Sequence, residues 1–172
     1  MNTKNALPLA RPFVKLVVPV IATVMVFSAH PSIISSPSPA SAESVISQLG
    51  ADIDGEAAGD RSGWSISLNS DGTRVAIGAN LNDGTTGDDD DNRGHTRIYQ
   101  YNSDTSSWEQ LGADIDGEAA GDQSGNSVSL SANGSRVAIG AVTNDGNGLN
   151  AGHARIFEYD SNNGWTQLGA DI

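Results

Sequence analysis

The sequence predicts an all-β fold of about two four-stranded antiparallel units that follow an N-terminal leader. Three observations predict it. The thirteen residues QLGADIDGEAAGD occur at 48–60 and again, unchanged, at 110–122. Each copy is followed by short segments in which polar and apolar residues alternate, which is the pattern of half-buried strands. No amphipathic helical pattern occurs after residue 43, so we expect strands and turns alone.

The duplication extends well beyond these thirteen residues. Residues 62–80 match 124–142, and 94–101 match 152–159, whereas the difference in length between the copies falls in one polar loop. Loops tolerate insertions and packed strands do not, so this is the pattern of structural repeats. We expect a signal peptide at 1–42, repeat 1 at 43–109, repeat 2 at 110–166, and the truncated start of a third repeat at 167–172.

Four short strands are expected in each repeat. In repeat 1 they are 65–68, 74–79, 96–101 and 108–111. The dipeptide Asp71-Gly72, with Asn133-Gly134 in repeat 2, is a typical two-residue hairpin turn between the first two strands. Four antiparallel strands that recur with a period of about 60 residues favour the blades of a β-propeller.

A propeller blade cannot bury both faces of its sheet alone, so neighbouring blades must stack on it. Closed propellers use about four to eight blades, more than this sequence supplies. Two alternatives remain open. One is a free-standing β-sandwich, and the other is a fragment without a stable fold of its own. In such a fragment, open blade edges would favour self-association.

The first 42 residues have the order of a secretory signal peptide. Lys4, Arg11 and Lys15 precede the first acidic residue, 16–29 is apolar, and 40–42 offers an Ala-x-Ala cleavage pattern. The apolar run is shorter than the roughly 20 residues that span a bilayer. We expect a secreted, periplasmic or cell-surface protein with no membrane span after cleavage. An uncleaved anchor is the alternative.

The chain after the leader is strongly acidic. Six arginines stand there against all 21 acidic residues of the sequence, and no lysine follows Lys15. Nucleic-acid backbones repel such a surface, so we expect no nucleic-acid partner. Divalent cations are natural counterions of this charge, although it also serves solvation alone. The absence of cysteine excludes stabilisation by disulfides.

Three motifs occur twice in register and resemble those of one known family. They are GDRSGWSISL and GDQSGNSVSL (59–68 and 121–130), VAIGA (75–79 and 137–141), and GHTRIYQY and GHARIFEY (94–101 and 152–159). This order resembles the FG-GAP repeat, the blade of integrin α-chain propellers and of many secreted bacterial and algal proteins. Ser62 and Ser124 replace the family's Phe, and Asn80 and Val142 its Pro, so a bacterial-style variant is expected. The resemblance implies a seven-bladed, extracellular, non-enzymatic propeller used for adhesion or recognition.

Two acidic loops are candidate calcium sites. Their carboxylates recur at alternating positions: Asp52, Asp54, Glu56 and Asp60 in repeat 1, and Asp114, Asp116, Glu118 and Asp122 in repeat 2. Oxygen donors spaced in this way can converge on one Ca²⁺, which takes about six to eight oxygens. The alternative is a solvated connection between blades. The hairpin in which the family binds calcium is reduced here to 70–72 and 132–134, so that site is not carried over.

The sequence offers no catalytic constellation, and we expect no enzyme. Only His95 and His153 follow residue 43, at equivalent positions, which favours a packing role. The run Asp88 to Asp91, near Asp83, is typical of a solvated loop. We therefore expect a non-catalytic propeller module that binds an extracellular protein or glycan. The alternative is a truncated part of a larger secreted enzyme that contains a propeller.

Overall fold

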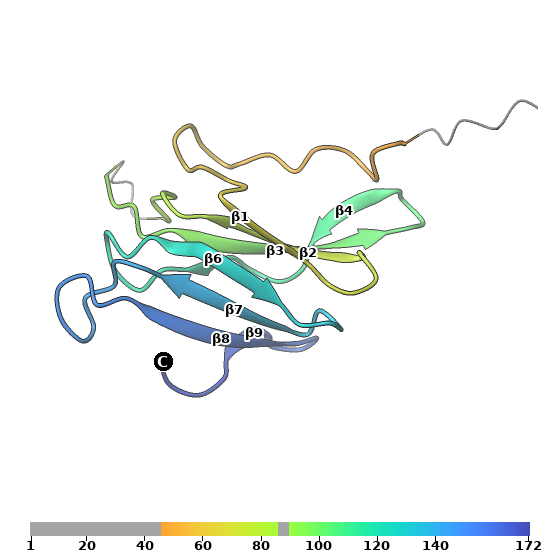
Figure 1. Cartoon of the computed structure of the whole chain (residues 1–172). Helices are drawn as coiled ribbons and strands as arrows, with labels where there is room; N and C mark the ends of the chain where they lie inside the picture. Colours follow the sequence, from red (N-terminus) through yellow and green to blue (C-terminus); the bar gives the residue numbers. More distant parts are fainter. Residues whose placement is uncertain (1–45, 86–89) are drawn as a thin grey trace, which may run out of the picture. The chain divides into compact units, whose positions relative to one another are not determined.

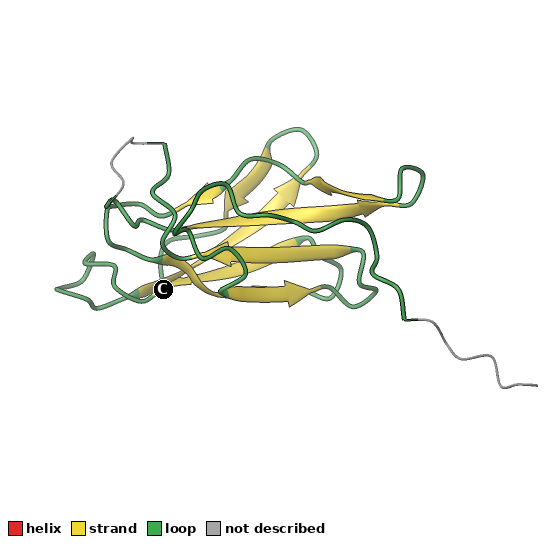
Figure 2. Ribbon diagram, turned by 90° about the horizontal axis from the view of Figure 1, so that it is seen from above, coloured by secondary structure: helices red, strands yellow, loops and turns green. Residues whose placement is uncertain are grey.

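The computed structural model describes residues 46–85 and 90–172, and the predicted signal peptide lies outside these ranges. The described residues fall within one compact unit and form strands and turns. Figure 2 shows this unit from above, with strands joined by loops. None of the described residues forms a helix that is long and apolar enough to cross a membrane. The all-β prediction is confirmed.

Two antiparallel sheets make up this unit (Figure 1). Sheet 1 has the order β1-β2-β3-β4, and β5 pairs with the start of β3. Its strands are β1 (Ser65–Leu68), β2 (Arg74–Ala79), β3 (His95–Asn102), β4 (Ser107–Gln110) and β5 (Ile115–Asp116). Sheet 2 has the order β6-β7-β8-β9. Its strands are β6 (Ser124–Leu130), β7 (Arg136–Ala141), β8 (His153–Asp160) and β9 (Gly164–Gln167).

The predicted strands of repeat 1 agree with sheet 1 to within one residue at each end. The predicted turn forms at Asp71-Gly72, but not as a two-residue hairpin, because the last paired residues of β1 and β2 are Leu68 and Val75 and Asn69 N donates to the carbonyl of Arg74. Asp71 Oδ1 accepts hydrogen bonds from Thr73 N at 2.9 Å and from Thr73 Oγ1 at 2.6 Å, and these bonds lower the pKa of the Asp71 carboxyl. Gly72 has φ of 72°, the left-handed conformation that glycine adopts at no steric cost.

Each sheet has two distinct faces, set by its register. In sheet 1, Val75 pairs with Tyr99 and lies on what we call the front face, while Ala76 pairs with Ile98 on the back face. In sheet 2, Val137 pairs with Phe157 on the front face. The same register places Ala138 and Ile156 on the back face of sheet 2.

The main core lies between the back face of sheet 1 and the front face of sheet 2. Its buried residues are Ala76, Ile98, Ile115, Leu130, Val137, Ile139 and Phe157. Ile98 and Val137 are both 0% exposed. Each buried side chain of this size contributes about 1.5–3 kcal/mol, so this contact holds the two sheets together.

A smaller apolar cluster covers part of the front face of sheet 1. It contains Val75, Ile77 and Tyr99, with Ile53 and Trp108 packed against them. The indole nitrogen of Trp108 donates a hydrogen bond to the carbonyl of Leu49 at 2.8 Å. Trp165 makes the equivalent bond to Leu111 at 2.7 Å. The segments 48–53 and 110–115 therefore lie in the same way against their own repeats.

Candidate metal centres at the repeat junctions

The structure brings together two equivalent groups of ionisable side chains. Junction cluster 1 consists of Glu56, His95 and Asp114, and junction cluster 2 of Glu118, His153 and Asp171. The ligand atoms of each group lie within 4.8 Å of one another. Each cluster joins consecutive repeats, because its Glu and His come from one repeat and its Asp from the start of the next.

The histidine is the least exposed member of each cluster: His95 is buried, and His153 has 8% of its side chain exposed. His95 begins β3 with 2% of its side chain exposed, and its Nδ1 lies 3.7 Å from Glu56 Oε2 and 3.8 Å from Asp114 Oδ2. In cluster 2, His153 Nδ1 lies 3.8 Å from Glu118 Oε2 and 3.7 Å from Asp171 Oδ2. All four distances exceed those of hydrogen bonds. They suit atoms that surround one small cation, since zinc binds nitrogen and oxygen at about 2.0–2.2 Å.

The carboxylates are held in place by neighbouring side chains. Gln110 Nε2 donates to Asp114 Oδ1 at 2.6 Å, which leaves Oδ2 towards the histidine. Gln167 donates to Asp171 Oδ1 at 2.8 Å in the same way. Such outer hydrogen bonds orient the ligands of known metal sites.

An arginine lies beside the glutamate of each cluster. Arg97 Nη1 lies 3.6 Å from Glu56 Oε1, and its Nη2 donates to the carbonyl of Asp54 at 2.7 Å. Arg155 repeats these contacts with Glu118 at 3.7 Å and with the carbonyl of Asp116 at 2.6 Å. The arginine thus holds the acidic loop against the strand that carries the histidine.

Burial controls the charge state of His95. Desolvation lowers its pKa below the ordinary value, and this outweighs the opposite effect of the nearby Asp114 and Glu56 carboxylates. The imidazole is therefore neutral near pH 7, which is the form that ligates a metal.

The remaining acidic residues of the predicted calcium loops have other contacts. Asp60 is 3% exposed, and its Oδ2 accepts from Ala57 N and from Asn82 Nδ2, both at 3.0 Å. Asp122 is 2% exposed and accepts from Ala119 N at 2.9 Å and from Asn144 Nδ2 at 3.0 Å. These two aspartates stabilise the fold of their loops.

Asp52, Asp54 and Asp116 lie outside the two clusters. Asp52 Oδ1 accepts from Gln48 Nε2 at 2.7 Å, as Asp114 does from Gln110. Asp54 and Asp116 contribute their backbone carbonyls to the arginines. Among the described residues, the acids that meet at a cluster come from neighbouring repeats rather than from one loop.

The hairpins that correspond to the family's calcium loops do not fit a cation. Asp71 Oδ1 is already engaged by Thr73. Asn133 Oδ1 accepts from Ser135 N at 3.1 Å and from the hydroxyls of Ser131 and Ser135, both at 2.9 Å. Their oxygens therefore stabilise the turns.

A polar cavity opens beside junction cluster 2. It has a volume of about 380 Å³ and is lined by Asn144, Gly146, Asn147, Gly152, His153, Asp171 and Ile172. Two members of the cluster thus form part of its wall. The cavity combines amide, carboxylate and imidazole groups, all of which can form hydrogen bonds with a polar ligand.

Comparison with known proteins identifies one repeat directly. Residues 113–157 match the FG-GAP repeat family, while no curated protein matches the chain. The matched range runs from β5 through most of β8 and includes Glu118 and His153 of junction cluster 2. The antiparallel sheets have the strand order expected of propeller blades. Residues 113–157 of this protein are therefore an FG-GAP repeat.

Proposed function

We propose that the chain is a non-catalytic, extracellular recognition module that binds a glycan or a protein surface through the loop end of its sheets. The observation that supports this proposal is the polar cavity of about 380 Å³ beside junction cluster 2. Binding sites are typically concave and contain a few well-placed polar groups, and this cavity has both properties.

The cavity lies where the longer loops gather. In Figure 1, residues 142–152 and 90–94, which lead into β8 and β3, lie at one end of the sheets. The hairpin turns of 70–72 and 132–134 lie at the opposite end. Loops on a rigid sheet scaffold are a common place for recognition sites, because they can vary without disturbing the core.

The chemistry of the wall suits hydroxyl-rich or amide-rich ligands. Asn147 is exposed, so its amide can both donate and accept hydrogen bonds. Asp171 adds a carboxylate with 44% of its side chain exposed. The near-symmetry of the two clusters favours recognition over catalysis, because active sites are normally asymmetric. The predicted signal peptide supports a secreted or surface location for this binding role.

Ligand binding can be tested with a printed array of neutral and acidic oligosaccharides and a panel of immobilised extracellular proteins. We expect at least one class of probe to bind, and Asn147→Ala to weaken that binding about tenfold. Asn162→Ala is the matched control, because Asn162 is also exposed but lies in the turn before β9. The absence of binding to every probe, or equal losses in both variants, would contradict the proposal.

The junction clusters are proposed to hold a divalent cation. The acidic loops alone favour calcium, which takes oxygen ligands. A buried imidazole nitrogen with two carboxylates favours zinc or a similar ion instead. An ion at this position would connect consecutive repeats and stabilise their junction.

Calorimetric titration of the metal-free chain with Zn²⁺ and with Ca²⁺ distinguishes these ions. We expect two Zn²⁺ ions per chain, one after His95→Asn or His153→Asn, and none in the double variant. Saturation at 100 times Kd would stabilise the fold by about 2.7 kcal/mol per site. Asp104→Asn, in an exposed turn outside both clusters, should bind as the native chain does. Binding of Ca²⁺ alone, or no binding, would exclude the imidazole-centred site.

A further inference from the structure

The two sheets each leave one face outside the main core: the front face of sheet 1 and the back face of sheet 2. We propose that the back face of sheet 2 packs on the front face of sheet 1 of a second copy of this chain. This head-to-tail contact would repeat the interface that joins sheets 1 and 2 within one copy. The proposal goes beyond ligand recognition and depends on a different part of the molecule.

The internal interface defines the contacts that a second copy must reproduce. Ser65 Oγ donates to the carbonyl of Gly125 at 2.7 Å, and Leu130 N donates to Ser67 Oγ at 2.9 Å. Arg74 Nη1 donates to the carbonyl of Gly134 at 3.0 Å. Sheet 1 thus contributes two serines and an arginine, and sheet 2 contributes backbone groups.

The outward faces carry the matching groups. By the repeat alignment, Ser65, Ser67 and Arg74 correspond to Ser127, Ser129 and Arg136 of sheet 2. Their partners Gly125, Leu130 and Gly134 correspond to Gly63, Leu68 and Gly72 of sheet 1. Each of the three hydrogen bonds can therefore form between copies without any change of residue type.

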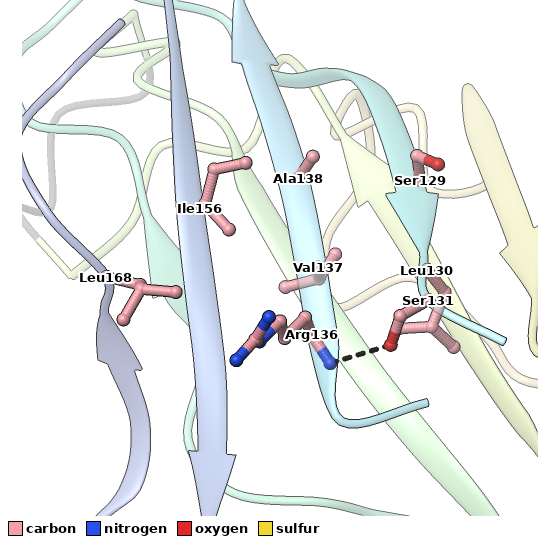
Figure 3. A pocket seen from close by; sticks show the side chains of 8 residues that line it. All are labelled: Ser129, Leu130, Ser131, Arg136, Val137, Ala138, Ile156 and Leu168. Carbon is pink, nitrogen blue, oxygen red and sulfur yellow. Dashed lines mark hydrogen bonds between the residues drawn. The ribbon is translucent and has the colours of Figure 1, made fainter. Parts of the chain in front are cut away.

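The apolar surfaces match in the same way. Ile66 and Leu68 on the front face of sheet 1 are 62% and 58% exposed, whereas Leu130, the equivalent of Leu68, is 9% exposed inside the interface. A groove of about 500 Å³ in sheet 2 is lined by Ser129, Leu130, Ser131, Arg136, Val137, Ala138, Ile156 and Leu168 (Figure 3). Of these, Ser129, Ala138 and Ile156 share the back face by the strand register. Ala138 and Ile156 there correspond to Ala76 and Ile98, which are buried against sheet 2.

Glycine allows the close approach that this contact needs. A Cβ on Gly78 would overlap the carbonyl oxygen of Gly125, so the internal interface requires glycine at position 78. Its equivalent, Gly140, is also glycine, and a Cβ there would meet only the side chain and carbonyl of Ser127. Gly63, the equivalent of Gly125, would face Gly140 in the stack.

Two identical hexapeptides compete for one position in the stack. In the internal interface, 110–115 bridges the sheets: Leu111 N donates to the carbonyl of Ile98 at 2.7 Å, and Trp165 donates to the Leu111 carbonyl at 2.7 Å. Both 48–53 and 167–172 have the same sequence, QLGADI. The segment 167–172 of one copy and 48–53 of the next would meet at the same place, so one of them must move.

The segment 167–172 is the better anchored of the two. Leu168 N donates to the carbonyl of Ile156 at 2.7 Å, and Ile172 exchanges two backbone hydrogen bonds with Ala154 at 3.0 and 3.1 Å. In the proposed stack, the segment 167–172 therefore stays on β8 of its own copy. The segment 48–53 of the second copy is displaced from the front face of sheet 1. Trp108 of that copy then donates to the carbonyl of Leu168, as Trp165 does to Leu111.

One contact of the internal interface is lost between copies. Ser70 Oγ donates to the carbonyl of Ala132 at 2.8 Å, but its equivalent on sheet 2 is Ala132, which has no hydroxyl. The contact between copies is therefore weaker than the internal one. Head-to-tail contacts generate closed rings or open stacks. Closed propellers contain about four to eight blades, so a ring would take about two to four copies.

Light scattering of the full chain, over a range of concentrations, tests the association. The salt concentration should be about 0.15 M, which screens the net negative charge. We expect the mass to rise from that of the monomer, 17.7 kDa for the full sequence, to that of two or more copies. Leu68→Glu should remain monomeric, and Leu149→Glu, an equally drastic change at an 85% exposed loop position, should associate as the native chain does. A monomeric native chain at all concentrations would overturn the proposal.

Cysteine cross-linking tests the head-to-tail geometry. The chain contains no cysteine, so introduced thiols report only their own contacts. Ser129 and Leu68 correspond to Ser67 and Leu130, which are hydrogen-bonded in the internal interface. We expect the double variant Ser129→Cys/Leu68→Cys to form a ladder of linked copies on oxidation, and each single variant to stay unlinked. Linked dimers of a single variant would show a symmetric contact instead and exclude this one.

Discussion

Sheets 1 and 2 share most of their sequence but have different surroundings. Leu68 is 58% exposed and Leu130 9%, although both end the first strand of a VAIGA-containing repeat. The back face of sheet 1 is buried by sheet 2, whereas the same face of sheet 2 lines an open groove. The repeat sequence thus determines the strands and their register, while burial depends on which neighbour a sheet has. Matched substitutions in the two sheets can measure that difference.

The largest effect is expected from truncating the shared isoleucine of the back face. Ile98 is 0% exposed between the sheets, so Ile98→Ala should destabilise the fold by about 2–5 kcal/mol. Ile156→Ala, at the equivalent half-buried position, should cost less than half as much. Urea unfolding at concentrations where the chain is monomeric measures both. Equal losses would mean that the two back faces are equally buried in solution.

The second comparison concerns glycine at the closest approach of the sheets. Gly78→Ala places a methyl group against the Gly125 carbonyl and should cost about 1–3 kcal/mol, because backbone atoms on both sides would have to move apart. Gly140→Ala meets Ser127 Oγ at 2.5 Å, and that side chain can rotate away. We expect a smaller loss of the free energy of unfolding there. Thermal melts of the two variants measure both losses. A larger loss for Gly140→Ala than for Gly78→Ala would contradict the close contact between Gly78 and Gly125.

The sequence predicted the strands well because their signals are local. The alternation in 65–68 and the turn at Asp71-Gly72 depend on neighbouring residues only, and the structure confirms both. The pairing of β5 with β3 was not predicted. It joins Ile115 to Thr96 and so keeps the start of repeat 2 in sheet 1, which is a contact between residues far apart in the chain.

The candidate site was predicted only in part, for the same reason. The acidic loops were recognised, and Glu56, Asp114 and Glu118 do belong to the junction clusters. The partners His95 and His153 were interpreted as packing residues, because no local spacing links them to the loops. The available signal was their equivalence in both repeats, together with a Gln-x-x-x-Asp segment that starts each following repeat. That signal indicates that the two histidines have the same role, but it does not show that they lie beside the acidic loops.

A third pair tests a feature that does not differ between the sheets. Asp60 and Asp122 are both buried and accept the same two hydrogen bonds, so Asp60→Ala and Asp122→Ala should each cost about 1–3 kcal/mol. In both variants, the amide of Asn82 or Asn144 loses its buried acceptor. Chemical denaturation of the two variants should therefore give similar losses. A difference of more than 1 kcal/mol would show that the loops, and not only the faces, depend on their neighbours.

The smallest expected difference concerns the arginine at the start of the second strand. Arg74 donates to the Gly134 carbonyl and lies 5.7 Å from the centroid of the Tyr159 ring, so Arg74→Ala should cost about 1 kcal/mol. Arg136 has 55% of its side chain exposed and pairs with Glu158 at 2.9 Å, a surface contact worth about 0.2–1 kcal/mol. At low concentration, Arg136→Ala should change the unfolding midpoint less than Arg74→Ala does. At high concentration, Arg136→Ala should weaken association between copies more than Arg74→Ala does, because only Arg136 faces a second copy. A variant of Arg136 that associates as strongly as the native chain would show that this arginine takes no part in the contact.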